Sequence, residues 1–297
     1  MPVLHDQWRA MSFSAYGYGG HSGGDNPADR GDAPGDEKNK KIPETEYFLS
    51  FPRGAAMGDF VHGILERLAR KDLKDCDFTA FLPENRSALN KLEEALGVAV
   101  ENNRLDRKKQ LPRLMDGLRR ALCTPLPGLD VPLCRTGKCI PEMEFFLKGE
   151  SLDLSRILAV MKECGSEKVR EVLKLSSGSE MTGVLNGLID LIFVHENKYY
   201  IVDWKTNFLG PRFADYDAPG VRHVMAESGY ILQYHLYTAA LCFFLKQRLP
   251  AFDYDQFGGV YYLFIRGMGS GENGIWFDRP PEACADELVK LFTGEGL

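Results

Sequence analysis

Two acidic residues inside apolar segments, Asp190 and Asp203, constrain this chain more than any other feature. Residues 184–194 are rich in Leu, Ile, Val and Phe, and residues 199–204 are aromatic and β-branched. The polar residues 195–198 between them are typical of a turn. The pattern predicts two antiparallel strands joined by a tight turn. A two- or four-residue loop centred in the polar segment sets Asp190 directly opposite Asp203.

Two carboxylates that face each other in an apolar setting repel, so losing one of them is expected not to lower the stability of the metal-free protein. A divalent cation reverses the sign of this interaction. Mg²⁺ suits carboxylate oxygens, Mn²⁺ can replace it, and the ion retains waters that can react. Lys205 shares a strand face with Asp203 and can activate such a water or hold a phosphate oxygen. The sequence predicts metal-assisted phosphodiester hydrolysis, with an exposed hairpin and a surface Asp–Lys pair as the alternative.

Five sequence blocks occur in an order that makes the pattern specific. They are GLIDLIF with YYIVDWKTN in the hairpin, FPRGAAMGDFVHGILERL at 51–68, EMEFFL at 142–147, LQYHLYTAAL at 232–241 and FGGVYYLFIRG at 257–267. Together they resemble the PD-(D/E)xK nuclease superfamily and, more narrowly, the C-terminal nuclease domain of the RecB family. The resemblance covers roughly residues 46–297 and implies an α/β fold, a central mixed β-sheet flanked by helices.

The resemblance also implies a set of site residues. Asp190, Asp203, Lys205 and Glu142 are the implied catalytic residues, and His62, Asp190, Asp203 and the backbone carbonyl of Trp204 are the implied metal ligands.

His62 lies in a predicted helix over residues 54–70, beside its apolar face. Gly58, His62 and Glu66 match the family pattern GxxxHxxxE, which implies that His62 binds the metal. Without the resemblance, a single helix histidine is more often a packed core or surface residue than a ligand.

Residues 140–147 alternate weakly and predict a strand in which Glu142 and Glu144 share a face. The family places a glutamate of this block near the metal. Glu142 matches the better position and Glu144 is the fallback, while two glutamates on a solvated edge remain the alternative.

Residues 222–249 predict one long amphipathic helix that ends before Pro250. Gln233 and Tyr237 lie four residues apart and therefore on one face. They match the family motif QxxxY, which implies that they position DNA beside the active site.

Three other segments complete the expected elements. Residues 78–122 and 151–175 predict helices, and residues 257–266 predict a buried strand. Residues 1–45 are expected to form a flexible leading segment and linker because 14–45 are rich in Gly, Asp, Pro and Lys. Residues 46–297 form the predicted nuclease domain.

The cysteine pattern and the hydropathy indicate a cytoplasmic protein. The chain has 297 residues and seven scattered cysteines, which argue against a disulfide framework. No run of 18 apolar residues is present, and the first residues lack a secretory signal.

The charge distribution leaves the mode of DNA binding open. The net charge is −6, but residues 104–120 form a basic stretch that either contacts phosphates or is a solvated helix face.

The resemblance implies a Mg²⁺-dependent DNA nuclease of double-strand-break repair and recombination. DNA is its implied partner, with RecC-like and RecD-like subunits and a helicase region if it belongs to a RecBCD-type complex. A non-catalytic DNA-binding or scaffold module with a nuclease-like fold is the alternative from another class. A hydrolase of small phosphoesters is a further alternative.

Overall fold

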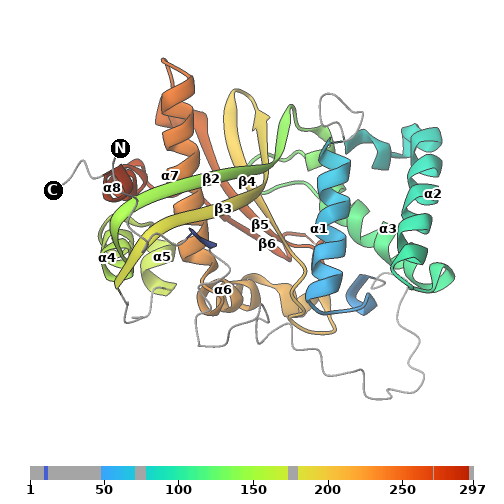
Figure 1. Cartoon of the computed structure of the whole chain (residues 1–297). Coiled ribbons are helices and arrows are strands. Elements are labelled where there is room, and N and C mark those ends of the chain that lie inside the picture. The colour runs from blue at the N-terminus through green and yellow to red at the C-terminus, as the bar shows by residue number, and fades with distance from the viewer. Residues whose placement is uncertain (1–9, 13–47, 71–77, 173–179, 270, 294–297) are drawn as a thin grey trace, which may run out of the picture.

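A mixed β-sheet forms the centre of the protein, and helices cover both of its faces (Figure 1). The computed structural model describes residues 10–12, 48–70, 78–172, 180–269 and 271–293. Within these ranges, no helix combines the length and the hydrophobicity that a bilayer span requires. The mixed sheet with helices on both faces confirms the predicted α/β class.

The predicted hairpin is the centre of the sheet. It consists of β3 (Glu180–His195) and β4 (Lys198–Lys205), with a two-residue turn at Glu196 and Asn197. Both turn residues have positive φ, 48° and 60°. This backbone is that of a type I′ turn, whose twist matches the twist of antiparallel strands.

The remaining strands extend the sheet on both sides of the hairpin. The strand β2 (Cys139–Asp153) pairs antiparallel with one edge of β3. On the opposite edge of β3, β1 (Ala10–Ser12) pairs parallel with residues 184–186. On the other side, β4 pairs parallel with β5 (Phe257–Phe264), which pairs antiparallel with β6 (Ile275–Asp278). Every residue of β5 is buried, as expected for a strand covered on both faces.

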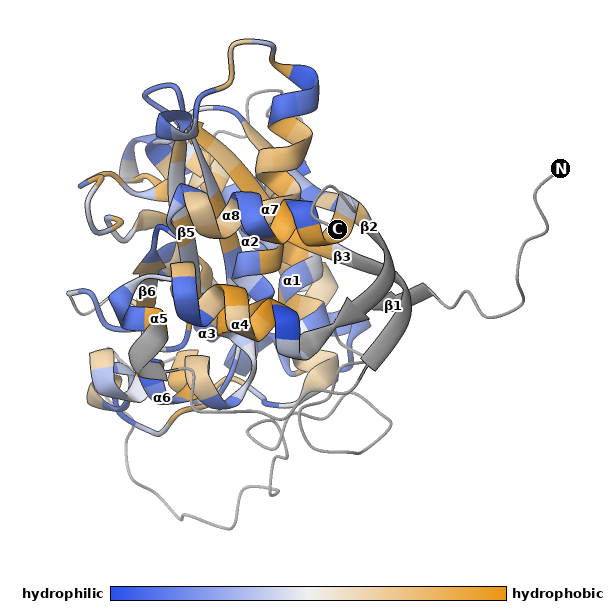
Figure 2. Ribbon diagram, turned by 90° about the vertical axis from the view of Figure 1, so that its left-hand side faces the viewer, coloured by the Kyte–Doolittle hydropathy of each residue, from blue (hydrophilic) through white to orange (hydrophobic). Residues whose placement is uncertain are grey.

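One face of the sheet packs against the C-terminal helices, which Figure 2 shows with their hydrophobic residues in orange. These helices are α4 (Leu154–Cys164), α5 (Glu167–Val172), α6 (Ala218–Glu227), α7 (Tyr230–Arg248) and α8 (Glu282–Thr293). The strands contribute Ile189, Ile201 and Tyr262 to this core.

The other face packs against three helices from the first half of the chain. They are α1 (Ala55–Arg70), α2 (Arg86–Asn102) and α3 (Arg107–Cys123). Val202 and Trp204 of β4 point into this second core, whereas Ile201 points into the first. This alternation is the pattern of a strand buried on both faces.

The expected single helix over residues 222–249 is wrong, because the chain forms two helices there. The helix α6 ends at Glu227, and α7 begins at Tyr230. Gly229 separates them with a φ of 70°, a left-handed conformation that glycine adopts without strain. The second helix, α7, is buried on most of its circumference rather than amphipathic.

The helix expected over residues 151–175 is also shorter than predicted. The strand β2 continues to Asp153, and the helical part divides into α4 and α5. Residues 173–175 lie outside the described residues. In the segment expected to be a linker, Ala10–Ser12 form β1, and the rest of residues 1–45 lie outside the described residues.

His235 is a buried polar side chain in the middle of α7, with 1% of its surface exposed. Its Nδ1 lies 2.7 Å from the carbonyl oxygen of Ile231, and its Nε2 has no hydrogen-bond partner. Burial lowers the pKa of His235 to about 4. The imidazole is therefore neutral in the folded protein at pH values where an unfolded chain protonates it.

His235→Leu should flatten the pH dependence of folding stability in mildly acidic solution. The wild-type protein loses stability as pH falls below the unfolded-state pKa of about 6.5, because only the unfolded chain takes up the proton. At about pH 5.5 this loss amounts to about 1.4 kcal/mol relative to the variant. Denaturant unfolding of both proteins at about pH 8 and pH 5.5 measures the difference. Parallel pH dependences would show that His235 does not titrate in this way.

Candidate active site

The register of the hairpin brings Asp190 and Asp203 together. The ladder between β3 and β4 ends with the pair Leu191 and Val202, and the same register continued by one residue places Asp190 opposite Asp203. The backbone N–H of Trp204 donates a 2.8 Å hydrogen bond to Oδ2 of Asp190. The carbonyl of a strand residue points to the same side as its N–H, so the Trp204 carbonyl also faces β3.

Asp203 forms an ion pair with Lys205, two residues further along β4. Both side chains are largely buried, with 3% of Asp203 and 13% of Lys205 exposed. Oδ1 of Asp203 accepts no hydrogen bond of ordinary geometry, although it is the oxygen nearest the ammonium group. Burial and the neighbouring Asp190 raise the pKa of Asp203 to about 6, despite the opposing effect of Lys205. Burial therefore outweighs the ion pair at this carboxylate.

His62 reaches the site from α1 and contacts Asp190, with 3.5 Å between Nδ1 and Oδ2. Burial alone would lower the pKa of His62, but the Asp190 carboxylate raises it above its ordinary value. Burial would raise the pKa of Asp190, and the charges of His62 and Lys205 lower it instead. The two carboxylates thus differ in their environment, and each has its own basic neighbour.

Gln233 and Tyr237 lie beside Lys205, on the face of α7 that meets the sheet. Oε1 of Gln233 accepts hydrogen bonds from Lys205 at 3.3 Å and from the Tyr262 hydroxyl at 2.9 Å. Its Nε2 donates to the Tyr237 hydroxyl at 2.8 Å. The expected common face is therefore observed, whereas contact of these residues with DNA stays a prediction. Tyr237 itself is buried, with 3% of its surface exposed.

Glu142 lies on β2, opposite Asp190 of β3. Its neighbours Pro141 and Met143 pair with Leu191 and Ile189, the residues on either side of Asp190. Glu142 has a positive φ of 50°, and its carboxylate lies 3.8 Å from Arg70 of α1. Burial and the charge of Glu66 raise its pKa above the ordinary value. The fallback residue, Glu144, is exposed. The geometry thus favours Glu142, whose catalytic role stays a prediction.

Two features hold α1 against the end of β4. The guanidinium of Arg266 donates to the carbonyl of Thr206 at 2.7 Å and to the carbonyls of Phe48, Phe51 and Pro52 at 3.3, 2.9 and 2.7 Å. It thereby joins the segment before α1 to the residue after Lys205.

Gly58 allows the close approach of α1 itself. A Cβ added at Gly58 would lie 3.1 Å from Oγ1 of Thr206, closer than ordinary van der Waals contact. The glycine of the GxxxH pattern therefore has a packing reason: it sets the distance between His62 and the hairpin.

The site residues suit a divalent cation by their chemistry. Carboxylate and carbonyl oxygens are ligands that Mg²⁺ prefers, and Asp190, Asp203 and the Trp204 carbonyl supply such oxygens at the end of the hairpin ladder. Across the described part of the chain, no group of three His, Cys, Asp or Glu side chains is arranged so that it could hold a metal ion as it stands. Asp203 faces Lys205 instead. Binding would therefore require Asp203 to exchange its lysine partner for the ion.

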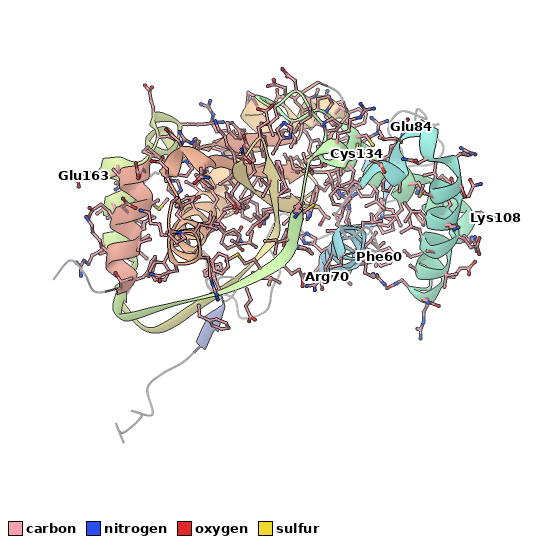
Figure 3. All side chains as sticks on the ribbon, turned by 90° about the horizontal axis from the view of Figure 1, so that it is seen from above. Phe60, Arg70, Glu84, Lys108, Cys134 and Glu163 are labelled. Atoms are coloured by element: carbon pink, nitrogen blue, oxygen red, sulfur yellow. The ribbon has the colours of Figure 1, made fainter. Side chains whose placement is uncertain are left out.

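The basic stretch is largely engaged in contacts within the helical side of the protein. Arg107 pairs with two glutamates of α2, at 2.8 and 3.4 Å, and Arg120 pairs with Asp116 at 2.8 Å. Arg113 donates to the carbonyl of Ser50. Figure 3 shows Lys108 at the outer margin of this side, away from the sheet. These contacts favour the solvated helix face over a phosphate-contacting one.

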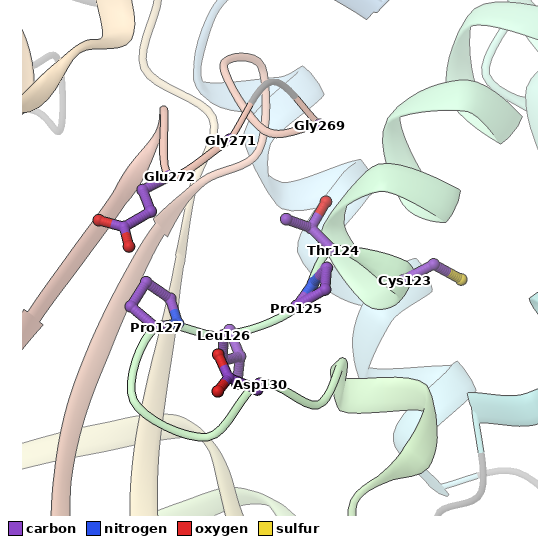
Figure 4. A pocket seen from close by; sticks show the side chains of 9 residues that line it. All are labelled: Cys123, Thr124, Pro125, Leu126, Pro127, Asp130, Gly269, Gly271 and Glu272. Carbon is purple, nitrogen blue, oxygen red and sulfur yellow. The ribbon is translucent and has the colours of Figure 1, made fainter.

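A surface cavity of 440 Å³ lies between the end of α3 and the loop that joins β5 to β6 (Figure 4). Cys123, Thr124, Asp130 and Glu272 are among the residues that line it. None of the predicted site residues lines this cavity. The cavity is therefore separate from the cluster of predicted site residues.

Known proteins with similar sequences share one description. The chain is 33% identical to the RecBCD enzyme subunit RecB of Haemophilus influenzae over 250 residues, which are 82% of this chain and 19% of that protein. It is 31% identical to the same subunit of Escherichia coli over 306 residues, 98% of this chain and 24% of that protein. The chain is homologous to the C-terminal nuclease region of RecB.

RecB of Mycolicibacterium smegmatis is 31% identical over 276 residues, which are 82% of this chain and 24% of that protein. No protein-family model matches the chain. The chain spans about a fifth to a quarter of the length of the RecB proteins it matches.

Several residues of the RecB-related site were not predicted from the sequence. The rings of Tyr230 and Tyr262 contact the ammonium group of Lys205. Arg266 donates to the carbonyl of Thr206. Tyr262 pairs with Asp203 across the parallel ladder of β4 and β5. A parallel pairing has no turn to fix its register, so this neighbour carries no local sequence signal.

Gly58→Ala should weaken divalent-cation binding at the candidate site, because the new methyl group would lie 3.1 Å from Oγ1 of Thr206 and the contact between α1 and the end of β4 must widen by a few tenths of an ångström. Gly63→Ala is the matched control in the same helix, since its Cβ would meet nothing closer than Arg67 at 3.9 Å. The control should gain up to about 1 kcal/mol of stability from helix propensity. Thermal unfolding and Mn²⁺ binding of the two variants measure the contrast. Equal effects in both would remove the packing role of Gly58.

Asp203 and Lys205 should depend on each other for stability in the metal-free protein. The sequence-based expectation considered only the repulsion between Asp190 and Asp203, whereas the structure adds the ion pair with Lys205. Asp203→Asn and Lys205→Met should each cost about 3 kcal/mol, because each leaves a buried charge without its partner. The double variant should lie within about 1 kcal/mol of the wild-type protein. Urea unfolding in chelator measures this cycle, and additive losses would contradict it.

Proposed function

We propose that this chain is a Mg²⁺-dependent deoxyribonuclease domain that hydrolyses phosphodiester bonds in DNA repair and recombination. One observation carries the proposal: α1, β3 and β4 bring His62, Asp190, Asp203 and Lys205 into one largely buried cluster. Similarity to RecB along most of the chain supports the same function.

In this proposal the metal is held by Asp190, Asp203, His62 and the carbonyl of Trp204. When bound, Mg²⁺ neutralises charge that develops on the phosphate and lowers the pKa of a coordinated water. Lys205 orients or activates the attacking water at its ammonium group. Glu142 adds a carboxylate at the edge of the cluster, and Gln233 keeps Lys205 in place.

The biological setting is proposed from the relatives. Their description as RecBCD enzyme subunits suggests assembly with RecC-like and RecD-like subunits, in the cytoplasm. A helicase region would then deliver single strands of DNA to the hairpin. The non-catalytic alternative requires a broken catalytic set, whereas Asp190, Asp203 and Lys205 are all present.

Asp203→Asn should abolish Mg²⁺-dependent DNA degradation, with a loss of about a thousandfold or more, because a carboxamide is a poor Mg²⁺ ligand. Release of acid-soluble nucleotides from single-stranded DNA measures the activity of the whole chain. Glu144→Gln is the matched control, since Glu144 is an exposed carboxylate of the same sheet, on β2. Its activity should stay within about twofold of wild type. A wild-type protein that binds DNA without cleaving it would support the scaffold alternative instead.

A further inference from the structure

Gln233 has a fixed orientation that presents an oxygen to Lys205. Its Oε1 accepts from Lys205 and Tyr262, and its Nε2 donates to the Tyr237 hydroxyl. A flipped amide would turn N–H groups toward an ammonium group and a hydroxyl donor, which is unfavourable. Two tyrosines on different elements, β5 and α7, therefore set the direction of one carboxamide.

The lysine itself lies in a pocket of aromatic rings. The Lys205 ammonium is 4.1 Å from the centre of the Tyr230 ring and 5.1 Å from that of Tyr262. Asp203 neutralises its charge in the observed state. If Asp203 turns to a metal ion, the ammonium remains in the same buried surroundings, repelled by the new cation. The Gln233 oxygen is then the acceptor that lies within its reach.

We propose that Gln233 is a positioning residue that holds the Lys205 ammonium when Asp203 leaves it for a divalent cation. This inference rests on the proposed function. It adds an explanation of how Lys205 stays in place both in the metal-free protein and in the protein with a bound metal. In the metal-free protein Lys205 neutralises Asp203. In the loaded protein Gln233 keeps the ammonium near the carboxylates without occupying the oxygen that the ion needs.

This role differs from direct contact with DNA, which the resemblance implies for the same residue. A residue that holds displaced Lys205 affects metal affinity in the absence of DNA, and it does so only while position 205 carries a positive charge. A residue that only contacts DNA does not affect metal affinity when DNA is absent, whichever residue occupies position 205. The two roles can therefore be separated without measuring cleavage.

A double-mutant cycle of metal binding tests the proposal. Titration calorimetry with Mn²⁺ alone is carried out on the wild-type chain, Gln233→Met, Lys205→Met and the double variant. Methionine approximates the length of glutamine without its polar atoms. Gln233→Met should weaken Mn²⁺ binding about tenfold, because the long 3.3 Å hydrogen bond of the metal-free protein must strengthen once Asp203 leaves Lys205, and only this gain is lost. In the Lys205→Met background the same change should have less than about a twofold effect.

Two further variants separate this role from packing. Tyr237→Phe removes the acceptor of Nε2 but leaves Oε1 oriented by Tyr262, so Mn²⁺ affinity should stay within about twofold of wild type. Gln233→Glu keeps an acceptor oxygen and should bind Mn²⁺ no more weakly than wild type. Both Gln233 variants are expected to fold, as thermal unfolding would verify.

The outcomes distinguish this inference from the function on which it rests. Equal weakening of Mn²⁺ binding by Gln233→Met in both backgrounds would overturn the positioning role. An unchanged Mn²⁺ affinity of the single variant Gln233→Met, in which Lys205 is present, would overturn it as well. In either case a wild-type chain that binds Mn²⁺ and cleaves DNA keeps the proposed function. A wild-type chain that neither binds Mn²⁺ nor cleaves DNA would overturn both.

Discussion

A two-residue turn fixes the register on which the whole site depends. Glu196 and Asn197 both adopt left-handed backbone conformations, so the turn between β3 and β4 permits one pairing of the strands. A slip of one residue would exchange the two faces of β4 and turn Asp203 toward the core that holds Val202 and Trp204. That core is apolar, so a carboxylate turned into it would lose its hydration and its contact with Lys205. The turn and the two cores therefore select the same register, and this register places Asp190 and Asp203 side by side.

The second requirement is the placement of α1, which lies far from the hairpin in sequence. Buried arginine is costly unless its donors are satisfied, and Arg266 donates to backbone carbonyls on both sides of the junction between α1 and β4. Gly58 removes the side chain that would hold the helix away from Thr206. The contact between His62 and Asp190 is therefore a consequence of packing in the first turn of α1 and in the segment before it. The histidine needs no local partner on α1 to reach the site.

The sequence was sufficient for features with a short-range cause. The hairpin follows from alternating β-branched and polar segments, and the shared face of Gln233 and Tyr237 follows from helical periodicity. It was insufficient where the cause is a pairing between distant segments. The contact of Tyr262 with Lys205 depends on a parallel register between β4 and β5, and that of Arg266 depends on folded carbonyls. The break at Gly229 was missed because a single glycine inside a helical pattern is compatible with either continuation or a left-handed stop.

Charge balance explains how such a cluster of carboxylates is stable without an ion. Asp190 contacts His62, Asp203 contacts Lys205 and Glu142 lies near Arg70, so each acid has a basic neighbour from this chain. A cation that enters the cluster gains carboxylate oxygens but also separates the pair of Asp203 and Lys205. Its affinity is the difference between the new contacts and the lost ion pair, and this difference is smaller than the ligand set alone would suggest. In the proposed metal site, a residue that stabilises the separated lysine therefore contributes to metal affinity although it is not a ligand.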